Sequence, residues 1–269
     1  CGFRGAGAEE EASLWRLRLM LAAMTRRELA VRTAGSAGGL LWLWLPPLAT
    51  VAAYFLVFDV VFAMRLGEHA PTSRVGTFLV VGALPWMAFG DALNRGMASL
   101  VDAGGLLQKN ALPPGLFPLR AVLASASIYA PLMGVLVLAY TPAHGFSPAL
   151  LALLPLLAGQ WLLCALLAYA LAILTAAVRD TAQVVTFMLS LGIFISPVLF
   201  PLSQFPAAWR WVLWLNPMTA PVLGYQSMLL QGQWPALVVW AALGAWLLAT
   251  AALLNLLLAR SREQLVDWL

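Results

Sequence analysis

Six stretches of this chain are apolar and long enough to cross a lipid bilayer, and they restrict the possible folds more than any other feature. A helix needs about 20 apolar residues to span the hydrocarbon core. The predicted spans cover residues 40–64, 77–93, 116–140, 149–178, 181–200 and 236–259. Backbone inside a bilayer has to satisfy its hydrogen bonds internally, so each span should be a helix. The sequence therefore predicts an all-α integral membrane protein with six transmembrane helices.

Composition supports a membrane protein rather than a soluble domain. Hydrophobic residues make up 62% of the 269 residues, and charged residues make up 10%. Soluble domains carry about 25% charged residues. A soluble fold of this size could not bury so much apolar surface in one core. We expect one six-span transmembrane domain over residues 34–262.

Lysines and arginines are distributed unevenly between the predicted loops. If the N-terminus is cytoplasmic, 12 of the 15 lie on the cytoplasmic side, and only Arg65, Arg74 and Arg210 lie outside. Cytoplasmic loops of membrane proteins carry such an excess. We therefore expect both termini in the cytoplasm. The net charge of +4 then reflects topology and contact with anionic lipid, rather than binding of nucleic acid.

The region before the first span has a different pattern. Residues 14–33 place Leu17, Leu21 and Met24 at helical spacing, with arginines on the other faces. This pattern predicts an amphipathic helix lying on the membrane surface. Residues 1–13 are expected to form a disordered tail, and residues 263–269 a cytoplasmic tail.

The segment between the last two predicted spans, residues 201–235, is too apolar for a solvated loop. It contains one charged residue, Arg210, among several aromatic residues. Pro206 can open a short helix that ends before Asn216 and Pro217. Thr219 can cap a second short helix, and Gly232 can end it. We expect two re-entrant helices with their turn at Asn216 and Pro217. An aromatic belt lying flat at the interface is the alternative.

The chain lacks the motifs of common catalytic sites. Its one lysine, Lys109, is followed by Asn110, so a P-loop cannot form. The sequence contains no metal-ligand cluster and no nucleophile elbow. Asp59 and Asp91 lie towards the ends of predicted spans, where a carboxylate can reach an interface. We expect no enzyme activity on this chain. If the chain transports a substrate, the lack of a carboxylate at mid-membrane favours an energy source outside the bilayer.

Three stretches of the chain carry a resemblance to a known family. They are Thr25-Arg26-Arg27-Glu28-Leu29, Lys109-Asn110-Ala111-Leu112-Pro113 and Leu215-Asn216-Pro217-Met218-Thr219. Their order and spacing resemble the membrane subunit of type-two ABC exporters, which move O-antigen, capsule and teichoic-acid polymers. The resemblance extends from about Leu14 to Arg262.

The resemblance implies a homodimer in the bacterial cytoplasmic (inner) membrane, working with two copies of a cytoplasmic ATPase subunit. The cargo would be a lipid-linked polysaccharide, moved along a pathway at the two-fold axis. ATP and magnesium would be held by the ATPase subunit, with no cofactor on this chain. Exporters of drugs or lipids with the same fold are the first alternative. An integral-membrane glycan-processing enzyme is the second.

Two groups of candidate residues follow from the resemblance. The loop between the second and third spans should form a short helix over residues 99–102, ended by Gly104 and Gly105, that rests on the ATPase. The candidate coupling residues are Ser99, Asp102, Gly104, Gly105, Lys109, Arg26, Arg27 and Glu28. Aromatic rings can stack on the C–H faces of sugars, so they are candidates for lining the pathway. The candidate aromatic residues are Trp42, Tyr54, Phe58, Trp86, Phe89, Trp209, Trp211 and Tyr225.

Overall fold

The computed structural model describes residues 3–39, 41–67, 70–110, 112–144 and 147–261, with side chains described from Trp15 onward except at residues 142–144. The helices are α1 (Phe3–Thr33), α2 (Leu41–Tyr54), η1 (Phe55–Val61), α3 (Val75–Asp102), α4 (Gly104–Leu107), α5 (Leu116–His144), α6 (Leu153–Ala177), α7 (Thr181–Gly192), α8 (Arg210–Leu213), α9 (Thr219–Gln231) and α10 (Leu237–Ser261). Short 3-10 turns precede α6 and α8. Within these ranges the fold is all-helical, with one isolated bridge between Arg65 and Arg74.

Five helical segments of the described chain are long and apolar enough to cross a membrane. They are Leu41–Val61, Val75–Asp102, Leu116–Thr141, Pro148–Ala177 and Leu237–Ser261. At the fifth predicted span, residues 181–200, the helix α7 covers only Thr181–Gly192. Twelve residues of helix measure about 18 Å, less than the ~30 Å of hydrocarbon. Turns follow α7, and Pro197 in them has no N–H with which to continue the helix.

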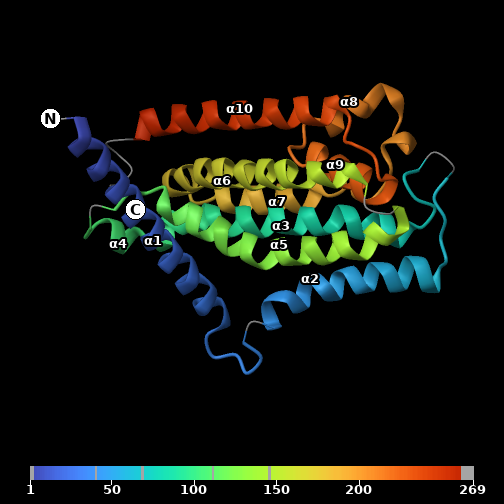
Figure 1. Ribbon diagram of the computed structural model, residues 1–269, viewed down its shortest axis with the longest axis horizontal. Helices are drawn as coiled ribbons and strands as arrows, with labels where there is room; N and C mark the ends of the chain where they lie inside the picture. The colour runs from blue at the N-terminus through green and yellow to red at the C-terminus, as the bar shows by residue number, and fades with distance from the viewer. Residues whose placement is uncertain (1–2, 40, 68–69, 111, 145–146, 262–269) are drawn as a thin grey trace.

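The helix α3 forms the centre of the bundle. In an apolar stretch of 18 residues within α3, 78% of the residues are buried inside the protein. The corresponding share is 6% for the span that starts with α2. Figure 1 shows α5, α6, α7 and α9 beside α3, with α10 and α2 along opposite sides. Gly96 allows a close approach of α3 to α6, because a Cβ there would lie 2.5 Å from the Cβ of Ala168.

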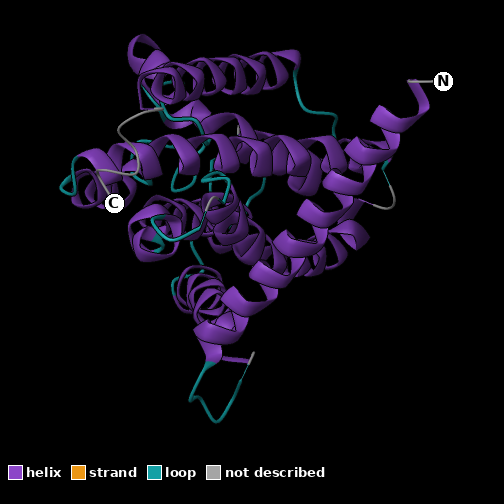
Figure 2. Cartoon of the chain, turned by 90° about the vertical axis from the view of Figure 1, so that its left-hand side faces the viewer, coloured by secondary structure: helices purple, strands orange, loops and turns teal. Residues whose placement is uncertain are grey.

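The helix α1 runs obliquely across one end of the bundle (Figures 1 and 2), and α4 lies at the same end (Figure 1). We call this the α1 end, and the opposite end, which holds α8 and α9, the α9 end. The helix begins at Phe3, so the expectation of a disordered tail over residues 1–13 is corrected from that residue onward. Alanine and glutamate, which are frequent before Trp15, favour helix.

The first span is joined to α3 by a carboxylate cap. α2 continues into the π-helical turn η1, and Ala63 then takes a positive φ of 47° to reverse the chain. Asp59 of η1 accepts hydrogen bonds from the backbone N–H groups of Gly76 (2.7 Å) and Thr77 (3.0 Å). These N–H groups lie in the first turn of α3, where a helix has no internal acceptor for them. Asp59 therefore has a structural role here.

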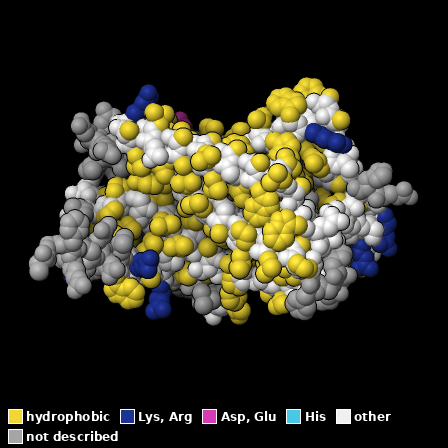
Figure 3. Space-filling view, turned by 45° about the horizontal axis from the view of Figure 1, so that its top comes forward, with side chains coloured by type: hydrophobic (Ala, Val, Ile, Leu, Met, Phe, Trp, Pro, Cys, Tyr) yellow, Lys and Arg dark blue, Asp and Glu magenta, His cyan; other side chains and the backbone are white. Residues whose placement is uncertain are grey.

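The outer surface of the bundle is apolar. Figure 3 shows hydrophobic side chains across the middle of one face, with lysine and arginine side chains towards its ends. Large side chains point away from the protein on several spans, among them Leu138, Leu154 and Leu248, each at least 70% exposed. Such a surface is stable in contact with lipid, so the chain is a multi-pass membrane protein.

Candidate functional site

A cluster of ion pairs lies where α1 meets the bundle, and we call it the ionic junction: Glu28, Arg32, Asp91, Arg95 and Arg120. The Arg32 guanidinium lies 3.4 Å from the Asp91 carboxylate and 3.6 Å from that of Glu28. Arg95 contacts Asp91 at 2.9 Å, and Arg120 lies 3.7 Å from Glu28. The junction therefore joins α1, α3 and α5 through side chains of alternating charge.

Hydrogen bonds complete the ionic junction. The Ser125 hydroxyl donates to Asp91, and Arg32 donates to the backbone carbonyl of Ala121. The Arg32 side chain is only 3% exposed. Burial, and then the nearby charge of Arg95, lower the pKa of Arg32 from its ordinary value. A buried charge of this kind is stable only while its partners stay in place.

Sequence reasoning found the ionic junction only in part. It treated Asp91 as a carboxylate reaching an interface, and it did not single out Arg32. The i,i+4 spacing of Asp91 and Arg95 was a signal for their pair. The link to Arg32 joins residues 59 positions apart, so only the folded chain reveals it.

The candidate coupling residues on α1 lie on different faces of the helix. Arg26 and Arg27 are exposed and line a shallow hollow of about 490 Å³ on α1. Glu28 was predicted, with these two arginines, to be a coupling residue that contacts the ATPase. It instead turns towards the bundle and pairs with Arg32 and Arg120, because it lies on the same helical face as Arg32.

The loop candidates around α4 adopt a different helix break from the one predicted. Residues 99–102 are the last turn of α3, and the break falls at Ala103. Gly104 and Gly105 do not end a helix; they open α4, because the Ala103 carbonyl accepts the N–H groups of Leu106 and Leu107.

The side chains of this loop divide into outward and inward groups. Asp102, Gly105 and Lys109 are exposed at the α1 end. Ser99 is buried and donates to the Gly96 carbonyl, and Gly104 is buried at the start of α4. Only the exposed group can contact another protein directly.

The candidate aromatic residues of the first two spans also differ in exposure. Trp42 is 55% exposed, while Tyr54 and Phe58 are half-buried with ring centroids 6.3 Å apart. Trp86 and Phe89 of α3 are buried, and their ring centroids lie 5.8 Å apart. In this conformation, the Trp86 and Phe89 rings face protein, so among these five Trp42 offers the most accessible ring.

The segment 201–235 forms short helices at the α9 end. α8 follows a 3-10 turn that starts after Pro206, and Gly232 ends α9 in the left-handed conformation, as the sequence indicated. Thr219 is the first residue of α9 rather than its cap, and its hydroxyl donates to the Leu213 carbonyl. α9 packs against α3 and α10.

Asn216 organises the turn between α8 and α9, next to Pro217. Its amide donates to the carbonyls of Gly192 (3.0 Å) and Ile195 (3.1 Å), which lie at and after the end of α7. Its side-chain oxygen accepts the N–H of Met218. The turn is therefore fixed to the carboxyl end of α7.

The aromatic candidates of this segment fall into two classes. Trp209 and Trp211 are 60% and 59% exposed. Tyr225 is fully buried, and its hydroxyl donates to Gln160 at 2.7 Å, while Gln160 donates to the Pro85 carbonyl. Tyr225 is thus part of the packed core of this conformation, whereas the two tryptophans are open to contact.

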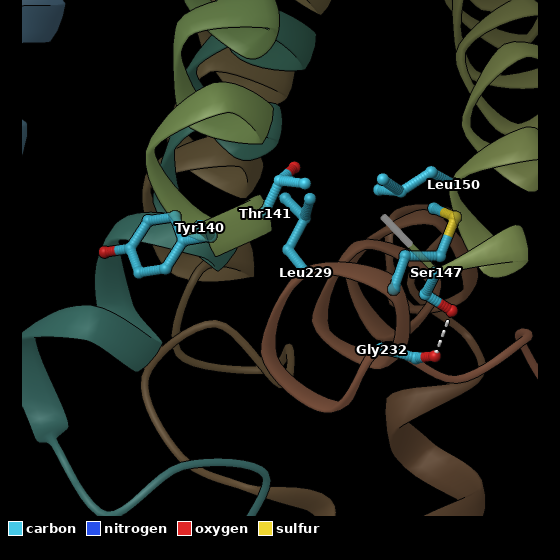
Figure 4. A pocket seen from close by; sticks show the side chains of 7 residues that line it. Tyr140, Thr141, Ser147, Leu150, Leu229 and Gly232 are labelled. Atoms are coloured by element: carbon cyan, nitrogen blue, oxygen red, sulfur yellow. Dashed lines mark hydrogen bonds between the residues drawn. The ribbon is translucent and has the colours of Figure 1, made fainter. Parts of the chain in front are cut away.

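A small cavity lies beside the end of α9, between Tyr140, Thr141, Ser147, Leu229 and Gly232 (Figure 4). The Ser147 hydroxyl donates to the Gly232 carbonyl at 2.7 Å, which fastens the loop after α5 to α9. The cavity volume is about 10 Å³. This is about the smallest space that holds one water molecule, so the cavity is a packing feature rather than a ligand site.

Among the residues that the structure describes, no three or more His, Cys, Asp or Glu side chains are grouped as metal ligands. The polar groupings of the described residues include the ionic junction, the exposed residues around α4 and the fixed turn at Asn216.

Comparison with known proteins gives consistent matches over most of the chain. The family described as "ABC-2 type transporter" matches residues 20–230. The O-antigen export system permease protein RfbA of Myxococcus xanthus is 31% identical over 227 residues, which are 82% of this chain and 84% of that protein. A protein of the same name from Klebsiella pneumoniae is 23% identical over 216 residues, 79% of this chain and 81% of that protein.

Proposed function

The chain belongs to the ABC-2 type transporter family, and from this membership we propose that it is the transmembrane subunit of an ATP-driven exporter of a lipid-linked polysaccharide. The observation that carries the proposal is the match to two relatives named as O-antigen export permeases, each over about four fifths of the chain. An O-antigen, capsule or teichoic-acid polymer is the proposed cargo, and the bacterial inner membrane is the proposed location.

ATP hydrolysis is assigned to two copies of a separate cytoplasmic subunit, which would also hold magnesium. The chain cannot build a P-loop, since its one lysine is followed by asparagine. The exposed residues Asp102, Gly105 and Lys109 beside α4 are the proposed contact with that subunit. Arg26 and Arg27 on α1 are a second proposed contact.

The ionic junction would carry movement from the ATPase into the membrane. A force on α1 acts on Arg32, whose partner Asp91 lies on the central helix α3. The same helix ends beside α4, so both proposed ATPase contacts converge on α3. Separating Arg32 from Asp91 would leave buried charges unpaired, so α1 and α3 should move together.

We propose that two copies of the chain form the pathway. The exposed face of α7 includes Val184, Phe187 and Met188, each about 60% exposed, and would meet lipid or the second copy. In this arrangement residues 181–200 act as a broken fifth span, and residues 201–235 return into the outer leaflet. Both termini would be cytoplasmic. Among the candidate aromatic residues, Trp42, Trp209 and Trp211 have exposed rings that a sliding sugar chain could contact.

Co-purification from membranes tests the assignment of an ATPase partner. The expected result is one P-loop ATPase subunit per copy of this chain, in a complex with two copies of each subunit. An isolated chain, obtained under conditions that keep it folded, would contradict the proposal.

A cell assay tests the cargo. Deletion of the gene should remove polysaccharide from the cell surface and leave it inside on its lipid carrier, and re-expression should restore it. Normal surface polysaccharide together with increased drug sensitivity or altered membrane lipid would instead support the alternative cargo classes.

A further inference from the structure

A cleft of about 380 Å³ lies between the first span (α2 and η1), α3 and α5. The helix α2 runs along the side of the bundle that also holds α5 (Figure 1). Apolar side chains from all three segments line the cleft, among them Leu48, Phe55, Val80, Leu84, Leu132 and Val135. The lining residues of each helix extend over about 10 Å of its length. The cleft is therefore a slot parallel to the helices, with apolar walls.

The slot has one polar end. Arg74, Thr77 and Tyr140 line it where α3 begins and α5 approaches its end, at the α9 end of the bundle. The backbone bridge between Arg65 and Arg74 brings a second arginine to the same place. Both arginine side chains are exposed, and neither has an ion-pair partner in the described part of the chain.

In the described part of the chain, the carboxylate near this end is Asp59, and it is already engaged. Asp59 accepts hydrogen bonds from the Gly76 and Thr77 N–H groups and from the Thr77 hydroxyl. Among the described residues, Arg74 therefore presents a positive charge without an ion-pair partner at the mouth of an apolar slot.

We propose that this cleft is a binding site for an anionic phospholipid, with an acyl chain between α2, α3 and α5 and the phosphate at Arg74. Charge complementarity selects this occupant, because guanidinium groups bind phosphate through paired, charge-assisted hydrogen bonds. The apolar walls match an acyl chain, which gains contacts there without leaving a hydrocarbon environment. A bound lipid would fill the space beside α2 and hold the first span against the bundle.

The site is separate from the proposed export activity. It lies on residues outside the candidate coupling groups, and it binds a membrane lipid rather than the cargo. Failure of the lipid proposal would leave the exporter assignment intact, and the reverse also holds.

The test measures lipid retention by the full chain, purified in detergent, with native mass spectrometry and thermal unfolding. Phosphatidylglycerol is the anionic probe, and phosphatidylcholine is the zwitterionic comparison. The wild-type chain should bind phosphatidylglycerol more tightly and unfold at a higher temperature with it. Arg74→Gln should weaken phosphatidylglycerol binding about tenfold, as expected for the loss of one charge-assisted contact, while Arg74→Lys should retain most of it.

A second pair of variants tests the apolar slot. Ala139 lines the cleft and is exposed, so Ala139→Phe should fill the slot and displace the acyl chain without a cost to folding. Leu138→Phe, on the outward face of the same helix, is the matched control and should leave lipid binding unchanged. Equal binding of both lipids, unchanged binding in Arg74→Gln or Ala139→Phe, or cross-linking of Val135→Cys to a second copy would each overturn the proposal.

Discussion

The guanidinium of Arg32 on α1 lies 3.4 Å from the carboxylate of Asp91 on α3, with the arginine side chain almost fully buried. The two residues are 59 positions apart. Their contact fixes the helix that crosses the α1 end to the central helix of the bundle. Any movement of α1 relative to α3 therefore has to break, or carry along, a buried ion pair.

Removal of the arginine should destabilise the protein. Arg32→Ala removes a positive charge that pairs with the carboxylates of Asp91 and Glu28. We therefore expect the free energy of unfolding to fall by roughly 3 kcal/mol. Thermal unfolding in detergent measures the change. Arg27→Ala, at an exposed position of the same helix, is the control and should have little effect. Equal unfolding temperatures for the two variants would show that the ionic junction contributes no net stability.

Reversal of charge beside α4 should uncouple the proposed ATPase. Asp102 is exposed at the end of α3, so Asp102→Arg should leave folding intact and reduce ATP-driven export in vesicles several-fold. Asp180→Arg, at the exposed turn before α7, is the control for an added positive charge. Export at the wild-type rate by Asp102→Arg would remove this residue from the coupling surface.

The exposed tryptophans should affect transport more than assembly. Trp211 is 59% exposed, so its truncation removes a contact surface rather than core packing. Trp211→Ala should lower polysaccharide export while the amount of assembled protein in the membrane stays near that of the wild type. Parallel loss of export and assembly would indicate that this ring anchors the protein in the interface instead.

The buried tyrosine should behave in the opposite way. Tyr225→Phe removes the hydroxyl that donates to Gln160, and an unsatisfied buried amide oxygen costs about 1–3 kcal/mol. We expect a lower unfolding temperature, with export preserved under conditions where the variant is folded. Tyr54→Phe, at a half-buried position, is the control. Lost export at unchanged stability would place Tyr225 in the pathway.

Orientation can be measured at Ser203, an exposed residue at the α9 end. In a Cys1→Ser background, a membrane-impermeant thiol reagent should label Ser203→Cys from outside the cell, because the native Cys164 is buried. A separate Arg27→Cys variant, made in the same Cys1→Ser background without Ser203→Cys, should be labelled only after the membrane is opened. Labelling of Ser203→Cys from the cytoplasmic side alone would reverse the proposed topology.

Local patterns were sufficient for the elements that depend on local physics. The apolar runs predicted the five long helices, because a helix in lipid needs only length and hydrophobicity. Gly232 ends α9 as its residue type indicated, since glycine adopts a positive φ without strain. Patterns failed at Gly104 and Gly105, where hydrogen bonds to the Ala103 carbonyl start a new helix.

The sequence by itself determined that this chain is a helical membrane protein, and its motifs resembled the right family. The tertiary structure decided which of the candidate residues are available. It buried Tyr225, Trp86 and Phe89, exposed Trp209 and Trp211, and turned Glu28 inward to Arg32. Helical periodicity gives the faces of one helix, but the neighbour of each face depends on contacts between residues far apart in the chain. The Arg32–Asp91 pair and the cleft beside α2 arise only from such contacts.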